Sequence, residues 1–187
     1  MRIISGRWRG TALAPVGAGD EAARLRPTSD RVRESLFNLL AHGDHAPLEG
    51  ARVLDLFAGT GALGLEALSR GAAFAVFVEQ GRPALKLLEA NLARLRAGDL
   101  ARVLPRDATR LGANPGEPAS LVFLDPPYGR GLGEQAIDAA LAGGWIAPGA
   151  TIVWEEGAMP PPPPGLTLRD RRQYGDTMIF LYKLTGP

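Results

Sequence analysis

The chain has 187 residues, of which 45% are hydrophobic and 22% charged, with a net charge of +1 and no cysteine. This composition indicates one folded domain with a sizeable core, and it excludes disulfides, thiolate metal sites and cysteine nucleophiles. No apolar stretch reaches the about 18 residues that a membrane span needs, and the polar start does not resemble a secretory signal, so we expect a cytoplasmic protein.

The basic residues concentrate near the N-terminus. The first 40 residues carry seven arginines against four acidic residues, and the remainder is mildly acidic. Such a basic arm predicts contact with a polyanion. Residues 2–10 indicate a short strand and turn, in which Arg7 and Arg9 flank Trp8. We expect the arginines to contact phosphates, while Trp8 either stacks on a base or, as we favour, anchors the arm to its own domain.

A helix is predicted to begin after Pro27. Residues 28–30 are polar and can cap the first exposed N–H groups of this helix. The apolar residues that follow lie on one helical stripe, and they are Val32, Leu36, Leu39 and Leu40. Arg31, Arg33 and Glu34 lie off this stripe.

Strands and helices alternate from residue 51 onward. The predicted strands are 52–57, 73–79, 101–104, 121–124 and 151–155, and the predicted helices are 63–70, 82–96 and 132–141. This alternation predicts a parallel sheet with helices on both faces. Two further strands, 167–174 and 177–184, flank a Gly-Asp turn and predict an antiparallel pair at the end of the sheet. We divide the chain into an arm and helix over residues 1–45 and a main domain over residues 46–187.

A glycine-rich loop joins the first of these strands to the next helix. Gly59 and Gly61 allow a ligand to approach the backbone above the N-terminus of the helix. Together with Gly64 they form the pattern G-x-G-x-x-G, so a dinucleotide is the alternative ligand. Asp55 decides between the two, because its carboxylate is unfavourable beside a pyrophosphate. It favours instead the ammonium and sulfonium groups of S-adenosylmethionine.

Two more carboxylates follow the ends of strands. Glu79 ends the second strand and suits the ribose hydroxyls of either cofactor. Asp107 follows the third strand, where it can accept a hydrogen bond from an adenine amine or cap the next turn. The sequence leaves both roles of Asp107 open.

The tetrapeptide Asp125-Pro126-Pro127-Tyr128 follows the fourth strand. Two consecutive prolines cannot extend a strand, so the chain turns rigidly at this point. The turn presents a carboxylate, carbonyl groups and an aromatic ring, which together suit a planar group that carries an –NH2. Alone, the tetrapeptide fits an ordinary proline-stiffened turn equally well. Combined with the glycine loop, it predicts an amine-directed methyltransferase that acts on nucleic acid.

The ordered set of Asp55 to Gly61, Glu79, Asp107 and Asp125 to Tyr128 resembles the class I methyltransferases that modify exocyclic amines. Residues 2–10, 25–37, 61–71 and 129–132 narrow this to a resemblance to the RsmD family over nearly the whole chain. The resemblance implies an α/β, Rossmann-like fold with a seven-stranded, mostly parallel sheet and an antiparallel C-terminal hairpin. It also implies methyl transfer from S-adenosylmethionine to the N2 amine of a guanine in 16S ribosomal RNA.

The resemblance implies three groups of site residues. The catalytic group is Asp125, Pro126, Pro127 and Tyr128. The cofactor group is Asp55, Phe57, Ala58, Gly59, Thr60, Gly61, Glu79, Gln80, Asp107, Ala108, Thr28 and Arg31. The group that contacts substrate RNA is Arg7, Trp8, Arg9, Arg33 and Arg130.

In the expected mechanism the carboxylate of Asp125 and the carbonyl of Pro126 accept the two amine hydrogens. Asp125 is expected to be ionised at neutral pH, because the ordinary pKa of aspartate is about 3.9. Tyr128 is expected to stack on the extruded base. The product is S-adenosylhomocysteine, and no metal is required.

The expected partner is 16S ribosomal RNA within an assembling or assembled small ribosomal subunit. We expect the protein to be a monomer and not to bind a membrane. Three alternatives remain at this point. They are an NAD-binding oxidoreductase built on the glycine loop, a non-catalytic RNA-binding module, and amine methylation of another base or of adenine N6 in DNA.

Overall fold

The structure is a computed structural model, and it describes residues 1–15, 29–42, 48–161, 163–175 and 177–186. Its strands are β1 (Arg52–Leu56), β2 (Phe74–Glu79), β3 (Ala101–Pro105), β4 (Ala119–Leu124), β5 (Ile146–Glu156), β6 (Leu166–Tyr174) and β7 (Thr177–Leu184). The helices are α1 (Asp30–His42), α2 (Ala62–Ser69), α3 (Arg82–Leu95) and α4 (Leu132–Ala142), with short 3-10 turns η1 (Gly98–Leu100) and η2 (Ala108–Arg110).

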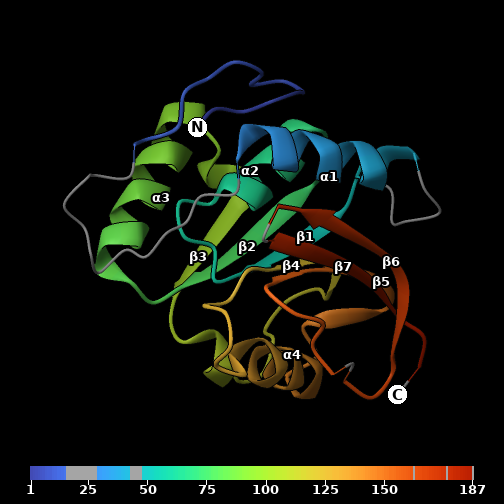
Figure 1. Cartoon of the computed structure of the whole chain (residues 1–187). Helices are drawn as coiled ribbons and strands as arrows, with labels where there is room; N and C mark the ends of the chain where they lie inside the picture. The colour runs from blue at the N-terminus through green and yellow to red at the C-terminus, as the bar shows by residue number, and fades with distance from the viewer. Residues whose placement is uncertain (16–28, 43–47, 162, 176, 187) are drawn as a thin grey trace.

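The seven strands form one sheet in the order β3-β2-β1-β4-β5-β7-β6 (Figure 1). The first four neighbouring pairs are parallel, and β7 pairs antiparallel with both β5 and β6. The predicted α/β fold with a final antiparallel pair is therefore confirmed. The strand order reverses between β1 and β4, and in such sheets ligands bind beyond the carboxyl ends of the strands at that reversal.

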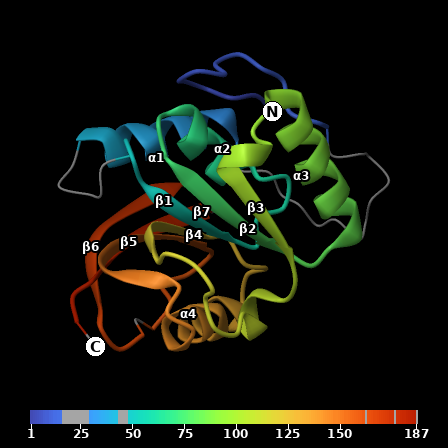
Figure 2. The ribbon, with the colours of Figure 1, turned by 180° about the vertical axis from the view of Figure 1, so that it is seen from behind.

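Helices cover both faces of the sheet. Helices α1, α2 and α3 lie on one face and α4 lies on the other, as Figure 1 and the reverse view in Figure 2 show. Each layer has its own hydrophobic cluster. On the first face Phe37 of α1 packs against Phe123 of β4, with ring centroids 5.6 Å apart, and on the second Ile137 of α4 lies in a cluster with Trp154. None of the described helices has the length and apolar character of a membrane span.

The N-terminal arm is an irregular hairpin packed on the helical layer that contains α2. Arg2 and Ala12 form an antiparallel bridge, and the backbone of Ile3 pairs with that of Thr11. Ile3 and Leu13 are buried in the same hydrophobic cluster as the sheet. The arm thus contributes to the core, while the predicted division at residue 45 lies outside the described residues.

Candidate active site

Two loops leave neighbouring strands at the carboxyl edge of the sheet. Leu56 at the end of β1 is in register with Leu124 at the end of β4. The glycine loop that follows β1 and the turn Asp125–Tyr128 that follows β4 therefore start side by side. They lie where the strand order reverses, which is the expected position for a ligand in this architecture.

The glycine loop is held in a tight and unusual backbone conformation. Phe57, Gly59 and Gly61 have φ angles of 61°, 56° and 80°, all in the left-handed region that side chains disfavour. A Cβ atom on Gly61 would lie 2.4 Å from Cδ1 of Leu88. A non-glycine residue in this conformation costs about 1–3 kcal/mol, and such costs concentrate at functional sites.

Asp55 lies beneath this loop with only 3% of its surface exposed. Its Oδ2 accepts a hydrogen bond of 2.9 Å from the backbone N–H of Gly64, so it holds the first turn of α2. Burial raises the pKa of Asp55 to about 8, and the charge of Glu79 adds to the shift. A positive ligand beside Asp55 would lower this pKa again and keep the carboxylate ionised, which suits the positive charges of S-adenosylmethionine.

Glu79 ties the end of β2 to the glycine loop. Its Oε2 accepts from the N–H of Gly59 at 2.8 Å, and its Oε1 accepts from the N–H groups of Gln80 and Gly81 at 2.9 and 2.6 Å. A carboxylate offers about four acceptor positions, so Glu79 retains acceptor capacity for a ribose hydroxyl. Its orientation is fixed by the backbone of both strand ends.

Asp107 caps η2, which is one of the two roles that the sequence left open. Its Oδ1 accepts from the backbone N–H of Thr109 at 2.9 Å and from the hydroxyl of the same residue at 2.8 Å. A contact of its second oxygen with an adenine amine stays a proposal. The neighbouring Ala108 is buried, whereas Gln80 is exposed.

Asp125 lies among other carboxylates. Because Leu124 is in register with Trp154, Asp125 stands beside Glu155 at the ends of β4 and β5. Burial is the main cause that raises the pKa of Asp125 well above its usual value, and the charge of Glu155 is the next, with smaller effects from Asp55 and Glu156. The expectation of an ordinary aspartate pKa is therefore wrong. A positive ligand beside these carboxylates would lower the pKa again.

Tyr128 is fixed by its hydroxyl group. The hydroxyl donates to Oε1 of Glu155 at 2.9 Å and lies 3.5 Å from the hydroxyl oxygen of Thr177. Burial raises the pKa of Tyr128, so the phenol stays neutral and remains a donor. The ring lies against Gly157, where an added Cβ would be 3.2 Å from it. The turn thus presents a carboxylate and an immobilised ring beside the glycine loop.

The comparisons with known proteins agree with this geometry. The family model described as Conserved hypothetical protein 95 matches residues 1–183. Ribosomal RNA small subunit methyltransferase D of Escherichia coli K12 is 44% identical over 186 residues, which cover 98% of this chain and 89% of that protein. The chain belongs to the RsmD family.

Further relatives span similar lengths. The protein of the same name from Haemophilus influenzae is 39% identical over 158 residues, covering 83% of this chain and 78% of its own. The solved structure of the Escherichia coli protein yhhF superposes with a TM-score of 0.85 at 43% identity, covering 100% of this chain and 99% of that one. TrmN from Thermus thermophilus, at 24% identity and a TM-score of 0.64, covers 87% of this chain and 51% of its own and shares the fold.

Membership of the RsmD family makes the chain a methyltransferase. This finding contradicts the NAD-binding alternative.

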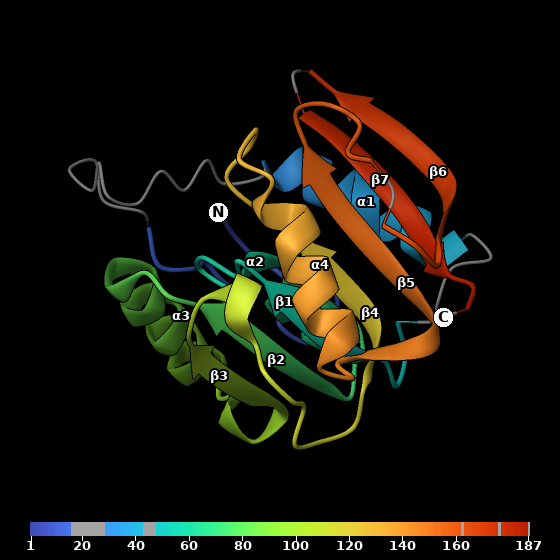
Figure 3. The ribbon, with the colours of Figure 1, turned by 90° about the horizontal axis from the view of Figure 1, so that it is seen from below.

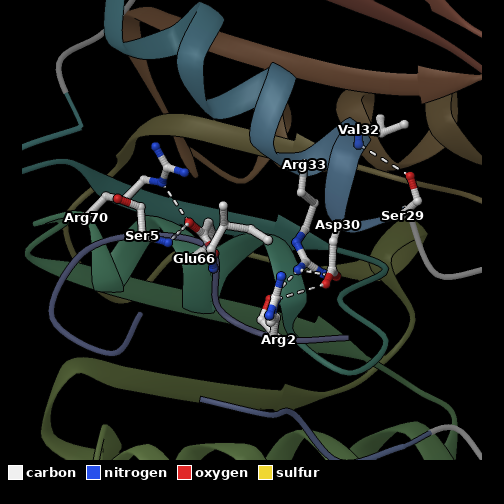
Figure 4. Close-up of polar contacts among 9 residues, drawn as sticks. Arg2, Ser5, Ser29, Asp30, Val32, Arg33, Glu66 and Arg70 are labelled. Carbon is white, nitrogen blue, oxygen red and sulfur yellow. Dashed lines mark hydrogen bonds and ion pairs between the residues drawn. The ribbon is translucent and has the colours of Figure 1, made fainter. Parts of the chain in front are cut away.

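Arg33 is a buried structural residue in this RsmD-family chain, and the prediction that it contacts RNA phosphate is wrong. Its guanidinium donates to Oδ1 of Asp30 at 2.9 Å and makes a short hydrogen bond to the carbonyl of Arg2 (Figure 4). Burial lowers the pKa of Arg33, opposed by the charges of Asp30 and Glu66. The buried stripe of α1 consists of Arg33, Leu36, Phe37 and Leu40, so position 33 faces the core.

Glu66 docks the N-terminal hairpin on α2, and the sequence analysis missed it. This fully buried carboxylate accepts from the N–H groups of Ile4 and Ser5 at 2.7 and 3.0 Å, and from Nε of Arg70 at 2.7 Å (Figure 4). A single acid within the apolar helix Ala62–Ser69 was the available signal. Arg70 is a local partner four residues along the chain, but Ile4 and Ser5 lie about 60 residues away and could not be inferred locally.

The turn of the hairpin adjoins the C-terminal end of α2, on the side of the sheet where the parallel strands begin. Trp8 packs against the core and its backbone N–H donates to the hydroxyl of Ser69, as expected for an anchor. Arg7 donates twice to the carbonyl of Leu68, at 3.3 and 3.0 Å, and its guanidinium lies 4.5 Å from the Trp8 ring centroid. Arg9 is exposed beside them. These residues adjoin the end of α2, away from Asp125, and their contact with RNA stays a proposal.

Asn91 is a second residue that the sequence analysis missed. This buried side chain of α3 accepts from the N–H of Ala14 at 2.7 Å and donates to the carbonyl of Thr60 at 2.9 Å. It therefore connects the hairpin to the glycine loop. A polar residue on the buried stripe of α3, beside Leu88, Leu92 and Leu95, was the signal that could have found it.

The remaining predicted residues are placed as follows. Ala58 and Thr60 are buried within the glycine loop, while Phe57 is half-buried. Arg31 is exposed in the first turn of α1, and Arg130 is exposed after Tyr128. Thr28 lies outside the described residues. The roles predicted for these side chains in binding cofactor or RNA stay proposals.

Proposed function

We propose that this protein transfers a methyl group from S-adenosylmethionine to the N2 amine of a guanine in 16S ribosomal RNA. The observation that carries the proposal is the pair of loops at the ends of β1 and β4, one with a buried carboxylate under glycines and one with Asp125 and Tyr128. The names of the relatives, which specify ribosomal RNA of the small subunit, support the same substrate.

Three carboxylates are available for the cofactor. In this proposal Asp55 binds the positive charge of the cofactor, Glu79 its ribose hydroxyls and Asp107 its adenine amine, and the hydrogen bonds that hold the three side chains support it. S-adenosylmethionine supplies, when bound, an activated methyl group on a sulfonium. Because the methyl is already activated, the protein contributes mainly by positioning and electrostatics.

Asp125 and the carbonyl of Pro126 act on the target amine. The lone pair of guanine N2 is delocalised into the ring, which makes the amine a poor nucleophile. Two acceptors that bind its hydrogens turn the lone pair out of the ring plane. Asp125 can do this only when ionised, so its raised pKa must fall when a positive charge binds beside it. In this proposal the same carboxylate accepts the proton that the methylated amine releases.

Tyr128 supplies the stacking surface for an extruded base. Its ring is held by the hydrogen bond to Glu155, so it needs no reorganisation when the base arrives. The surrounding acidic groups favour guanine among the three bases that carry an amine. The N2 amine of guanine lies between the N1–H donor and the N3 acceptor, whereas the amines of adenine and cytosine have a ring-nitrogen acceptor and no ring N–H beside them. A carboxylate that faces the N1 side of the base is therefore matched by guanine alone.

The test is transfer of tritiated methyl from S-adenosylmethionine to three substrates: small ribosomal subunits, protein-free 16S RNA and double-stranded DNA. Labelled nucleosides are then separated after digestion. We expect N2-methylguanosine from one or both RNA substrates and no label in DNA. Label in N6-methyladenosine, in a cytosine product or in DNA would overturn the proposal.

A further inference from the structure

The candidate site is acidic, although its proposed substrate, RNA, is a polyanion. Five carboxylates lie at or near the carboxyl edge of the sheet, and they are Asp55, Glu79, Asp125, Glu155 and Glu156. Phosphates on both sides of the target guanine must approach this negative charge. Arginines are needed to offset this charge. Arg33 is buried, Arg7 and Arg9 adjoin the end of α2 away from Asp125, and Arg130 is a single exposed arginine directly after Tyr128.

Strand β6 is a basic strand at the outer edge of the sheet (Figure 3). Over Leu166–Tyr174 it carries three arginines and a single acid. Arg169, Arg171 and Arg172 are all exposed. Arg172 pairs with Asp170 at 2.8 Å, yet 52% of its side chain remains accessible. The strand therefore presents a positive edge to solvent.

The strand register places this edge in line with the target site. Arg172 pairs with Ile179 of β7, and Ile179 pairs with Glu155 of β5, which stands beside Asp125. Residues in register on neighbouring strands project from the same face of a sheet, so Arg172 projects from the face of Glu155. Arg171 is in register with Phe180 and Trp154 and projects from the opposite face, so the two arginines lie on both sides of the exposed edge. With strands about 4.8 Å apart, Arg172 lies three strands, or about 14 Å, from Asp125 at the level of the backbone. A few nucleotides of an unstacked strand span that distance.

The end of β6 also adjoins the residue that stacks on the target base. Tyr174 pairs with Thr177, whose hydroxyl lies 3.5 Å from that of Tyr128. Tyr174 is partly buried against the cluster that includes Phe37, which fixes this end of the strand. Tyr128 of the acidic site is thus connected through Thr177 and Tyr174 to the end of β6 that carries Arg172.

We propose that β6 binds the phosphates of RNA nucleotides that flank the target guanine, through Arg169, Arg171 and Arg172. This inference rests on the proposed function and adds to it the surface that compensates for the acidic site. Charged side chains on an edge strand also prevent edge-to-edge pairing of sheets. A role limited to that protection would not make substrate binding depend on salt.

The test compares two double variants. Arg171→Gln/Arg172→Gln removes two charges from β6, and Arg96→Gln/Arg102→Gln removes two exposed charges beside β3 at the opposite edge of the sheet. Methyl transfer to small ribosomal subunits is measured between 50 and 200 mM salt. For the β6 variant we expect a severalfold higher KM, an unchanged kcat and a slope of log KM against log salt reduced by about 2. The β3 variant should behave as the wild type.

Further measurements separate the possible failures. A β6 variant with the same KM and salt slope as the β3 variant would overturn the inference while leaving the proposed function intact. Wild-type protein that transfers no methyl to RNA would overturn the proposed function itself. Arg171→Lys/Arg172→Lys keeps the charges and should keep the slope, and equal binding of S-adenosylhomocysteine by all variants checks that each is folded.

Discussion

Asn91 offers the sharpest test of how the N-terminal hairpin supports the cofactor loop. Its side chain bridges the N–H of Ala14 and the carbonyl of Thr60, at 2.7 and 2.9 Å, and all three groups are buried. In Asn91→Ala both backbone groups lose this partner. An unpaired buried polar group costs about 1–3 kcal/mol, so we expect unfolding to become easier by about 2–6 kcal/mol. That is a large part of the roughly 5–15 kcal/mol that stabilises a typical domain.

The assay is urea unfolding of Asn91→Ala beside Asn38→Ala, an asparagine on the exposed face of α1 that should cost no more than about 0.5 kcal/mol. Titration calorimetry with S-adenosylhomocysteine measures the second consequence. Because Thr60 lies between Gly59 and Gly61, we expect weaker binding for Asn91→Ala alone. Equal stability of the two variants, with equal affinity, would refute the bridge.

Three further predictions concern the site. Gly59→Val places a β-branched residue at φ 56° and should abolish binding of S-adenosylhomocysteine in calorimetry, and retained affinity would contradict the loop's role. The pKa of Asp55 is raised to about 8, so its contribution to stability is fully present below its ordinary value of 3.8 and is lost as the pH rises through 8. Asp55→Asn should therefore flatten the fall in unfolding free energy between pH 4 and 8, and a parallel decline in both proteins would oppose this. Tyr128→Phe removes the donor to Glu155, and we expect kcat to fall about tenfold or more while cofactor affinity persists, a loss of about 1.5–3 kcal/mol.

Much of the fold could be predicted because its signals are local. Apolar runs bounded by glycine and proline indicated the strands, and the Gly-Asp turn indicated the final hairpin of the sheet. The two loops of the site were also readable, since proline fixes the turn at Asp125 and glycines shape the loop after Asp55. In each case the chemistry of the residues and the local backbone point to the same structure.

The errors arose where distant segments decide the outcome. In α1 two stripes of residues fit helical spacing, one through Val32 and one through Arg33. The stripe through Val32 was predicted to be buried, because arginine side chains are normally outside a core. The carbonyl of Arg2 and the charges of Asp30 and Glu66 reverse that choice.

The residues that the sequence analysis missed have the same origin. Glu66 and Asn91 find backbone partners 62 and 77 residues away. Glu155 meets Tyr128 only because β4 and β5 are neighbours. No local pattern contains those contacts, although a lone polar residue on an apolar stripe marks where to look.

The account depends most directly on Asp125 as an acceptor for the target amine. The decisive measurement is single-turnover methyl transfer by Asp125→Ala to small ribosomal subunits, with S-adenosylhomocysteine affinity measured in parallel. Loss of a charge-assisted hydrogen bond costs about 1.5–3 kcal/mol, so the rate should fall at least roughly tenfold while cofactor affinity is unchanged. Transfer at the wild-type rate, or loss of cofactor binding without a separate effect on transfer, would contradict the account.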